Sequence, residues 1–321
     1  MRWLIVGAGA LGSVLAGHLV RAGEDVTLLT RGARAKLLRE RGLTLTGLSS
    51  FTLPVRIIED PTAVKSADVL VLTVKTYDTE AALAPLKHVQ VESCFSVQNG
   101  VVKDEQLAAV FGESAVLGCA ADFSGEVLAD GVVRYTRNEG LYLGELNGGI
   151  SDRVRAIAAL LEAAAIHTIT SQNIQSVEWS KLVGWLAITA PAVLTRLVTH
   201  RLVQDPDVAR LQVLLAKEAV QVSDKLGIPL EDLFMASPSR TLVRSTPEEW
   251  MERSRQYGLN MEAQGLTAHK MSALQDLERG RRLEIEETFG YIVQKAAELG
   301  LSVPRLETCY RLLLALDRTG R

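Results

Sequence analysis

Short apolar runs alternate with helix-like segments through the first half of the chain. The apolar runs are nearly continuous in Val, Leu and Ile and lie at residues 3–6, 25–29, 68–74, 94–97 and 115–119. Such runs are typical of parallel strands covered on both faces, because strands with one solvated face alternate with polar residues instead. Helices are predicted between them at residues 10–22, 34–41, 79–86 and 104–111. This alternation predicts a doubly wound parallel sheet of the α/β class.

The pattern changes after residue 123. Turn signals at residues 129–131 and 138–140 separate runs that carry Val and Tyr, which predicts an antiparallel meander at a sheet edge. From residue 173 onward the periodicity is almost wholly helical, with helices expected at residues 174–190, 206–226, 266–277 and 284–299. We therefore predict two domains, residues 1–172 with the sheet and residues 173–321 all-helical, which pack closely around a cleft.

Composition narrows the classes of function. The chain has 321 residues, of which 47% are hydrophobic and 23% charged, so it can bury a substantial core. A formal net charge of -3 provides no attraction to nucleic acid or to an anionic membrane surface. The uncharged stretch at residues 182–194 is shorter than the roughly 20 residues of a bilayer span and predicts a buried helix. The three cysteines show no disulfide or metal-binding spacing, so we expect free thiols, a cytoplasmic location and no metal site.

A glycine-rich turn follows the first predicted strand directly. It opens the helix predicted at residues 10–22 and reads Gly7-Ala8-Gly9-Ala10-Leu11-Gly12. In this context Gly7 permits a tight turn, Gly9 lets the backbone approach a pyrophosphate and Gly12 allows the helix to pack closely on the strand. The alternative is a glycine turn that serves packing alone. Its position between a strand and a helix favours dinucleotide binding in a Rossmann-type domain.

The residue after the second predicted strand bears on the type of cofactor. NAD-binding domains carry an acidic residue about 20 positions after the glycines, which binds the ribose hydroxyls. This chain has Arg31 there, with Arg34 one turn further on. A guanidinium suits a 2'-phosphate, so NADP(H) is favoured over NAD(H). The alternative is a solvated surface arginine.

Polar residues end two further predicted strands. Lys75 follows the run at residues 68–74, and Asn99 follows the run at residues 94–97 within the triplet Gln98-Asn99-Gly100. Ligands bind doubly wound sheets beyond the carboxyl ends of the strands, so both residues are candidates for contact with a cofactor or substrate. A plain turn at Asn99 and a solvated helix cap at Lys75 explain these residues equally well when they are taken alone.

In the helical half, a charged residue precedes the uncharged stretch. Lys181 lies there, and a lysine that begins a buried helix needs a partner or a lowered pKa. Trp185 and Thr189 follow four and eight residues later and share its helical face. Ser272 lies on a later predicted helix. Glu284 stands at a helix start, where acidic residues usually serve only to stabilise the helix dipole.

Together these residues resemble the ketopantoate reductase family, also called 2-dehydropantoate 2-reductase, over essentially the whole chain. The C-terminal part is the specific part, because a serine, a Leu-Gln-Asp triplet and a glutamate twelve residues after the serine are hard to obtain from a generic dehydrogenase. The matching residues are Gly7, Gly9, Gly12, Arg31, Lys75, Asn99, Lys181, Ser272, Asp276 and Glu284. The resemblance implies a Rossmann domain, an all-helical second domain and a substrate cleft.

The resemblance also implies a reaction and a role for each residue. Lys181 corresponds to the family's catalytic lysine and Glu284 to its partner acid. Lys75 and Asn99 correspond to contacts with cofactor and substrate, and Ser272 to a substrate contact. The implied reaction is the NADPH-dependent reduction of 2-dehydropantoate to (R)-pantoate in pantothenate and coenzyme A biosynthesis. Lys181 would stabilise and then protonate the carbonyl oxygen of this small 2-oxo acid.

The family pattern is broken at the substrate contacts. The family usually has asparagines four and eight residues after its lysine, where this chain has Trp185 and Thr189, and a further asparagine where this chain has His269. A lost hydrogen bond to a polar substrate costs about 1 to 3 kcal/mol. Either other groups, for which His269 is a candidate, hold ketopantoate, or the pocket lined by Trp185 and Thr189 suits a different small 2-oxo acid.

Two further alternatives stay open at this point. The protein could bind NADP(H) as a sensor or scaffold without turnover. The sequence determines neither the oligomeric state, for which a homodimer is one alternative, nor a role for residues 232–260.

Overall fold

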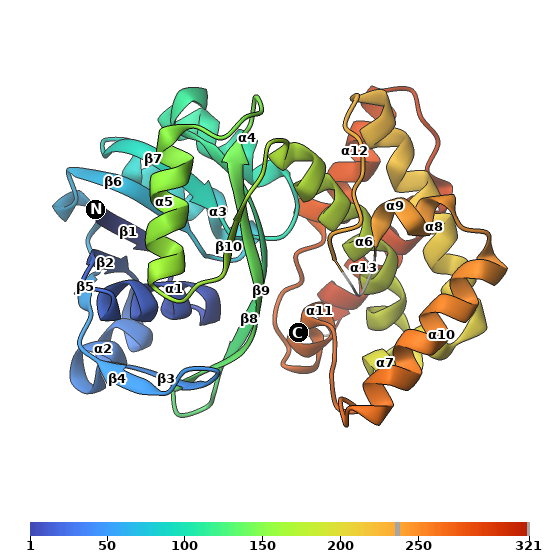
Figure 1. Cartoon of the computed structure of the whole chain (residues 1–321), viewed down its shortest axis with the longest axis horizontal. Helices are drawn as coiled ribbons and strands as arrows, with labels where there is room; N and C mark the ends of the chain where they lie inside the picture. Colours follow the sequence, from blue (N-terminus) through green and yellow to red (C-terminus); the bar gives the residue numbers. More distant parts are fainter. Residues whose placement is uncertain (235–237, 320–321) are drawn as a thin grey trace. The chain divides into compact units, whose positions relative to one another are not determined.

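The computed structural model describes residues 1–234 and 238–319. The chain divides into two compact units, Met1–Gln175 and Ser176–Arg321 (Figure 1). The division falls in the first turn of helix α6 (Ile174–Thr195), three residues after the boundary expected at residue 172.

The first unit contains a five-stranded parallel sheet, which confirms the predicted doubly wound fold. Its strand order is β5-β2-β1-β6-β7. The strands are β1 (Arg2–Val6), β2 (Asp25–Leu29), β5 (Arg56–Ile58), β6 (Ser66–Leu72) and β7 (Gln90–Ser96). The helices that follow its strands are α1 (Ala10–Arg21), α2 (Gly32–Arg41), α3 (Thr79–Leu83) and α4 (Val102–Phe111).

Alternate residues of the central strand enter different cores, which explains why its sequence is apolar throughout. Trp3 and Ile5 of β1 pack in one buried cluster, and Leu4 and Val6 pack in another. The first cluster includes residues of α1 and of α5 (Asp152–Ala163), and the second includes residues of α3 and α4. Both faces of the strand are therefore covered, as the continuous apolar run predicts.

A second sheet in this unit is built on a long antiparallel hairpin. Its hairpin strands are β8 (Leu117–Val127) and β9 (Val133–Glu145), and β3 (Leu43–Gly47), β4 (Phe51–Leu53) and β10 (Thr168–Thr170) complete it. The predicted turn at residues 129–131 is confirmed, because the amide of Leu128 donates to the carbonyl of Val132 at 2.8 Å. The sequence does not predict the short strands β3, β4 and β5, and the run at residues 115–119, predicted among the parallel strands, pairs antiparallel with β9 from Leu117 onward.

The second predicted turn, at residues 138–140, is wrong. These residues lie inside β9, opposite a register shift between Asp122 and Phe123 of β8. The side chain of Asn138 accepts from the amide of His167 at 3.1 Å and donates to the carbonyl of Ala165 at 3.2 Å. Asn138 therefore secures the segment that leads into β10. The local preference of Asn for turns gives no information about these long-range hydrogen bonds of its side-chain amide.

All regular elements of the second unit that the structure describes are helices (Figure 1). After α6 they are α7 (Thr199–Gln204), α8 (Pro206–Lys225), α9 (Ser239–Arg244), α10 (Pro247–Ala263), α11 (Ser272–Glu278), a π-helical turn (Glu286–Gly290), α12 (Tyr291–Glu298) and α13 (Pro304–Thr319). This agrees with the predicted helical second half. The buried helix predicted at residues 182–194 is part of α6 and is buried at almost every position.

Two predicted helices of this unit begin later than expected. The helix expected at residue 266 begins at Ser272, because Gly265 adopts a φ of +72° and the amide of Leu266 bonds to the carbonyl of Met261, which ends α10. The helix expected at residue 284 begins instead with the π-helical turn. The segment 232–260, to which the sequence assigned no role, forms α9 and most of α10; residues 235–237 lie outside the described residues.

No helix in the described ranges combines the length and the apolar character that crossing a bilayer requires.

Candidate active site

Two of the three motif glycines are required by packing inside the protein. Gly7 has a φ of +110°, which disfavours other residues, and a Cβ there would lie 2.9 Å from Val74 Cγ1. A Cβ on Gly12 would lie 2.2 Å from the carbonyl oxygen of Gly7 and 2.3 Å from Thr73 Oγ1. The hydroxyl of Thr73 lies 2.8 Å from the same Gly7 oxygen. Gly12 therefore lets α1 begin directly against the turn.

The third motif glycine has a different environment. A Cβ on Gly9 would meet nothing within 4 Å, and its φ of -68° is ordinary for any residue. No side chain caps α1, and the first described backbone bond of the helix runs from the amide of Ser13 to the carbonyl of Gly9. The preceding amides are those that a helix leaves without an intrahelical partner. Open space beside free amides and the positive end of a helix dipole fits the pyrophosphate of a dinucleotide.

The two arginines near this turn are held differently. Arg34 donates to the carbonyl of Ala8 at 3.1 Å, to the carbonyl of Gly131 at 2.6 Å and to Ser13 Oγ at 3.1 Å. Burial lowers the pKa of Arg34. Arg31, by contrast, is exposed at the start of α2, where its side chain makes no capping hydrogen bond. Arg34 braces the glycine turn, and Arg31 is the arginine that a ligand can reach.

Lys75 and Asn99 follow neighbouring strands at the same sheet edge. β6 and β7 pair in parallel with Leu72 beside Ser96, so their carboxyl ends lie together. Gln98 links the two loops, because its Nε2 donates to the carbonyl of Val74 at 2.8 Å and to Thr79 Oγ1 at 2.8 Å. Both candidate side chains are half-buried. Gln98 thus connects the loops that carry Lys75 and Asn99 through buried contacts that the sequence does not reveal.

In the second unit, one stripe of α6 stays accessible. Of residues 176–193, only Lys181 and Trp185 are not buried. They lie four residues apart and therefore on one helical face. Thr189, the next position on this face, is completely buried, and its hydroxyl has no hydrogen-bond partner among the described residues. Lys181 and Trp185 are available to a ligand, whereas contact with Thr189 would require neighbouring groups to move.

Glu284 and Ser272 belong to the same unit. Glu284 is buried, with 9% of the residue exposed, just before the π-helical turn, and the hydroxyl of Thr288 donates to its carbonyl oxygen. The ring of Phe289 in this turn lies 6.0 Å from the ring of Trp185, centre to centre. Ser272 is exposed at the first position of α11. The π-helical turn thus packs on the accessible stripe of α6. Turns of this kind are frequent at functional sites.

His269 is anchored to the start of α7. Its Nδ1 lies 2.9 Å from Thr199 Oγ1, and its carbonyl accepts from the amide of Thr199 at 2.8 Å. The residue therefore helps to place the segment that precedes Ser272. This contact within the second unit is not evident from the sequence.

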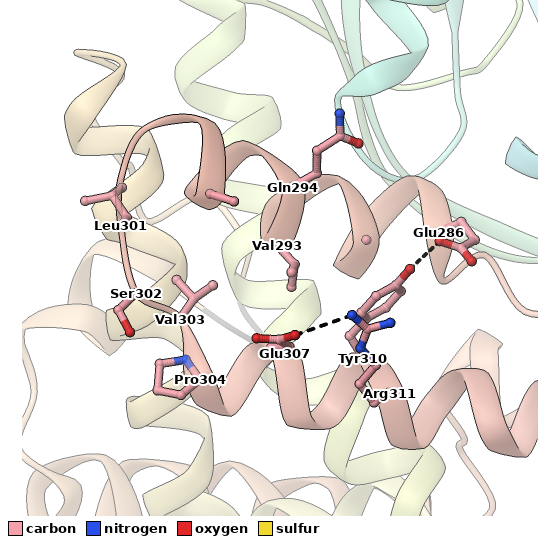
Figure 2. A pocket seen from close by; sticks show the side chains of 12 residues that line it. Glu286, Val293, Gln294, Leu301, Ser302, Val303, Pro304, Glu307, Tyr310 and Arg311 are labelled. Carbon is pink, nitrogen blue, oxygen red and sulfur yellow. Dashed lines mark hydrogen bonds and ion pairs between the residues drawn. The ribbon is translucent and has the colours of Figure 1, made fainter.

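A separate open cavity of about 590 Å³ lies between α12 and α13 (Figure 2). Tyr310 donates to Glu286 Oε2 at 2.5 Å in this cavity, and Arg311 pairs with Glu307 at 3.4 Å (Figure 2). Burial and the neighbouring Glu286 carboxylate raise the pKa of Tyr310 to about 12. Its lining includes neither Lys181 nor Glu284, so it is distinct from the predicted catalytic residues.

Both units match profiles of one protein family. Residues 3–148 match "Ketopantoate reductase PanE/ApbA", and residues 173–317 match "Ketopantoate reductase PanE/ApbA C terminal". The chain belongs to the ketopantoate reductase family. It is therefore a member of an oxidoreductase family that has a Rossmann-type first domain, and the resemblance stated from the motifs is confirmed.

Individual members of the ketopantoate reductase family match along the whole chain. The 2-dehydropantoate 2-reductase of Archaeoglobus fulgidus is 30% identical over 313 residues, which cover 98% of this chain and 97% of the relative. A crystal structure of a PanE/ApbA family ketopantoate reductase from Ralstonia eutropha is 26% identical, with a TM-score of 0.82 over 100% of this chain and 99% of that chain. D-mandelate dehydrogenase, solved with NADH and anilino(oxo)acetate, has a TM-score of 0.83 at 18% identity over 100% of this chain and 99% of that chain, which shows a common fold alone.

The roles assigned to single residues of this ketopantoate reductase family member stay predictions. They concern Lys181 and Glu284 in catalysis, the glycine turn, Arg31, Lys75 and Asn99 at the cofactor, and Trp185, Thr189 and Ser272 at the substrate.

Proposed function

We propose that the protein reduces 2-dehydropantoate to (R)-pantoate with NADPH, as a cytoplasmic enzyme of pantothenate and coenzyme A biosynthesis. The observation that carries this proposal is the match of both units to the ketopantoate reductase family. The 30% identical relative named for this reaction supports the substrate. The three cysteines are buried free thiols, which suits a reducing compartment.

The first unit binds the cofactor in this proposal. The amides at the start of α1 receive the pyrophosphate, and Arg31 receives the 2'-phosphate of NADPH. Lys75 and Asn99 contact the bound cofactor and the substrate, held in place by the bonds of Gln98. Bound NADPH supplies the hydride.

The second unit supplies the proton. Lys181 donates from Nζ to the C2 oxygen of the substrate, where negative charge develops as the carbonyl is reduced. Glu284 orients the ammonium group of Lys181. Ser272 donates a hydrogen bond to the substrate. The partial accessibility of Lys181 supports its role, because every other residue between 176 and 193 except Trp185 is buried.

A different small 2-oxo acid is the second candidate substrate. The indole of Trp185 is accessible and is held against Phe289, so it presents an apolar surface next to Lys181. An indole ring at this position favours an apolar or aromatic substituent over the hydroxyl-bearing chain of ketopantoate.

Steady-state oxidation of NADPH with ketopantoate and with a panel of 2-oxo acids tests the proposal. We expect kcat/KM to be highest for ketopantoate. The Trp185→Asn variant restores the amide usual in the family and is expected to raise the ratio of kcat/KM for ketopantoate over phenylglyoxylate. A wild-type protein that prefers phenylglyoxylate would transfer the proposal to the second candidate. A protein that binds NADPH but turns over no member of the panel would support the sensor or scaffold alternative.

A further inference from the structure

Three neighbouring strands of the first unit end together at one edge of the parallel sheet. Strands β1, β2 and β5 are neighbours in this sheet (Figure 1), with Val6 paired with Leu29 and Leu29 paired with Ile58. The pairing continues beyond the strands, because the amide of Gly7 donates to the carbonyl of Leu29 at 2.9 Å and the amide of Thr30 donates to the carbonyl of Ile58 at 3.1 Å. The residues that follow the three strands, namely the glycine turn, Arg31 and Glu59, therefore lie at the same edge.

The carboxylate of Glu59 binds the start of α2. Its Oε2 accepts from the amide of Gly32 at 3.1 Å, and its Oε1 pairs with Arg39 of the same helix. The hydrogen bonds from Arg39 and Gly32 hold the pKa of Glu59 below its ordinary value. The carboxylate is thus charged at neutral pH, and its side chain is still 41% exposed.

The backbone around this contact is open to a ligand. Gly32 has a φ of +64°, and a Cβ there would meet nothing within 4 Å. Its amide belongs to the residue directly after Arg31. A phosphate group bound by the Arg31 guanidinium would reach this helix-terminal amide, which is a favourable partner for an anion. In this structure the amide is already occupied by the Glu59 carboxylate.

We propose that Glu59 is a cofactor-selectivity residue, whose carboxylate competes with the 2'-phosphate of NADP(H) for the amide of Gly32 and thereby reduces the preference for NADP(H) over NAD(H). The inference rests on the proposed binding of the 2'-phosphate by Arg31. A phosphate monoester carries a charge of about -1.5 to -2 at pH 7, so a carboxylate at the same helix end repels it. Arg39 offsets part of this repulsion by its ion pair with Glu59. NAD(H) has a ribose hydroxyl in place of the phosphate and is not repelled.

The Glu59→Gln variant isolates the charge, because glutamine keeps an oxygen that can accept from Gly32. Dissociation constants of the full-length protein without substrate are measured by calorimetry for NADPH, NADH, adenosine 2',5'-bisphosphate and 5'-AMP. We expect NADPH and the bisphosphate to bind at least fivefold more tightly than to wild type, and NADH and 5'-AMP to change less than twofold. The nucleotide fragments report on the phosphate without the nicotinamide or any turnover.

Two matched variants make the result specific. Glu40→Gln removes the same charge from an exposed position of α2 and is expected to leave the NADPH to NADH ratio unchanged. Arg39→Gln is expected to weaken the binding of NADPH in the wild-type background. Its effect on NADPH binding should be smaller in the Glu59→Gln background, because the ion pair is then absent. An unchanged ratio in Glu59→Gln, or a change equal to that in Glu40→Gln, overturns the inference.

The Arg31→Ala variant separates this inference from the proposed function. We expect it to weaken the binding of NADPH and the bisphosphate much more than the binding of NADH and 5'-AMP. If it does and Glu59→Gln leaves the ratio unchanged, the inference about Glu59 fails alone. Equal losses for both cofactors in Arg31→Ala, with no shift in Glu59→Gln, refute the 2'-phosphate assignment and the inference with it. Equal losses of affinity for both cofactors in Arg31→Ala, even with a shift in Glu59→Gln, refute the binding of the 2'-phosphate by Arg31, and the inference that rests on it is overturned as well.

Discussion

In the first unit the candidate residues follow the ends of parallel strands, whereas in the second unit two of them, Lys181 and Trp185, form the accessible stripe of a largely buried helix. Backbone pairing places the glycine turn, Arg31 and Asn99 at one sheet edge. Side-chain burial leaves Lys181 and Trp185 half-buried while the other residues of α6 between 176 and 193 are buried. Strand register depends on a regular repeat and can be anticipated from sequence. The open face of a helix depends on which neighbours cover it.

The comparison predicts that substitutions in the two units affect different properties of the enzyme. The largest expected effect comes from the accessible stripe of α6. Replacing Lys181 with alanine is expected to lower kcat at least a hundredfold, because the proton donor is lost. The dissociation constant of NADPH should change less than threefold, since the phosphate contacts belong to the first unit. Stopped-flow turnover and calorimetry measure the two quantities. Lys217→Ala, at an exposed position of α8, is the control and should change neither.

A loss of NADPH affinity as large as the loss of kcat would break this comparison, because it would assign Lys181 to cofactor binding.

Substitutions of two glycines in the first unit are expected to distinguish a packing role from a ligand-binding role. Gly12→Ala places a methyl group 2.2 Å from a backbone oxygen and should destabilise the protein by about 3 kcal/mol. Gly9→Ala meets no protein atom and should change the free energy of unfolding by less than about 1 kcal/mol. Its NADPH affinity should nevertheless fall at least tenfold, because the methyl group enters the space assigned to the pyrophosphate. Urea denaturation and calorimetry distinguish the variants; equal destabilisation would make Gly9 a packing residue.

Two threonines provide the same comparison at smaller magnitude. Thr73→Val removes the hydroxyl bond to Gly7 and should cost about 1 kcal/mol of stability. Thr189→Val removes a buried hydroxyl without a described partner and should stabilise the protein by roughly 0.5 to 1 kcal/mol. The free energies of unfolding in urea measure both changes. A Thr189→Val variant that loses stability would show that the hydroxyl has a partner, and a selective rise in KM would show that the partner is the substrate.

The smallest expected effect is a pH dependence from the core of the first unit. His18 is buried with Nδ1 2.7 Å from the carbonyl of Ala164 and with Nε2 unpartnered among the described residues. Burial lowers the pKa of His18, so the folded state favours the neutral imidazole. The unfolded chain then binds more protons below its pKa of about 6.5, and stability present above that pH is lost as pH falls through it.

Urea denaturation between pH 8 and pH 5.5 measures this loss. The contribution of one group cannot exceed about 1.4 kcal/mol per pH unit. In the His18→Gln variant the component due to His18 should disappear. An identical pH slope in the two proteins would contradict the assignment.

Some elements could be predicted from sequence because their signals are local. β2 was predicted with its observed bounds, and α1 was predicted to within one residue. The failures have both long-range and local causes. Asn138 looks like a turn residue, but it binds the segment leading into β10. The helix expected at residue 266 is delayed by the left-handed Gly265, which ends α10. The capping box of Thr246 and Glu249 was a legible signal for α10 that the prediction did not use.

The candidate site shows the same division. The glycine turn and the Ser272 to Glu284 pattern identified the family, because both are short patterns of fixed spacing. The burial of Thr189 and the hydrogen bonds of Arg34 at the glycine turn could not be predicted from the sequence. Helical periodicity places Thr189 on the same face as Lys181, but one face of a helix need not be accessible along its whole length.

The sequence by itself determined the class of sheet, the helical second half and the family, since repeats and fixed spacings persist whatever the distant neighbours are. Only the tertiary structure decided which polar groups stay reachable and which are held. Arg34 makes three hydrogen bonds inside the protein, while Arg31 is exposed. The carboxylate of Glu59 accepts a hydrogen bond from the amide of Gly32, although the two residues are far apart in the chain. Such contacts depend on strand order and close packing, which bring together residues that no local pattern links.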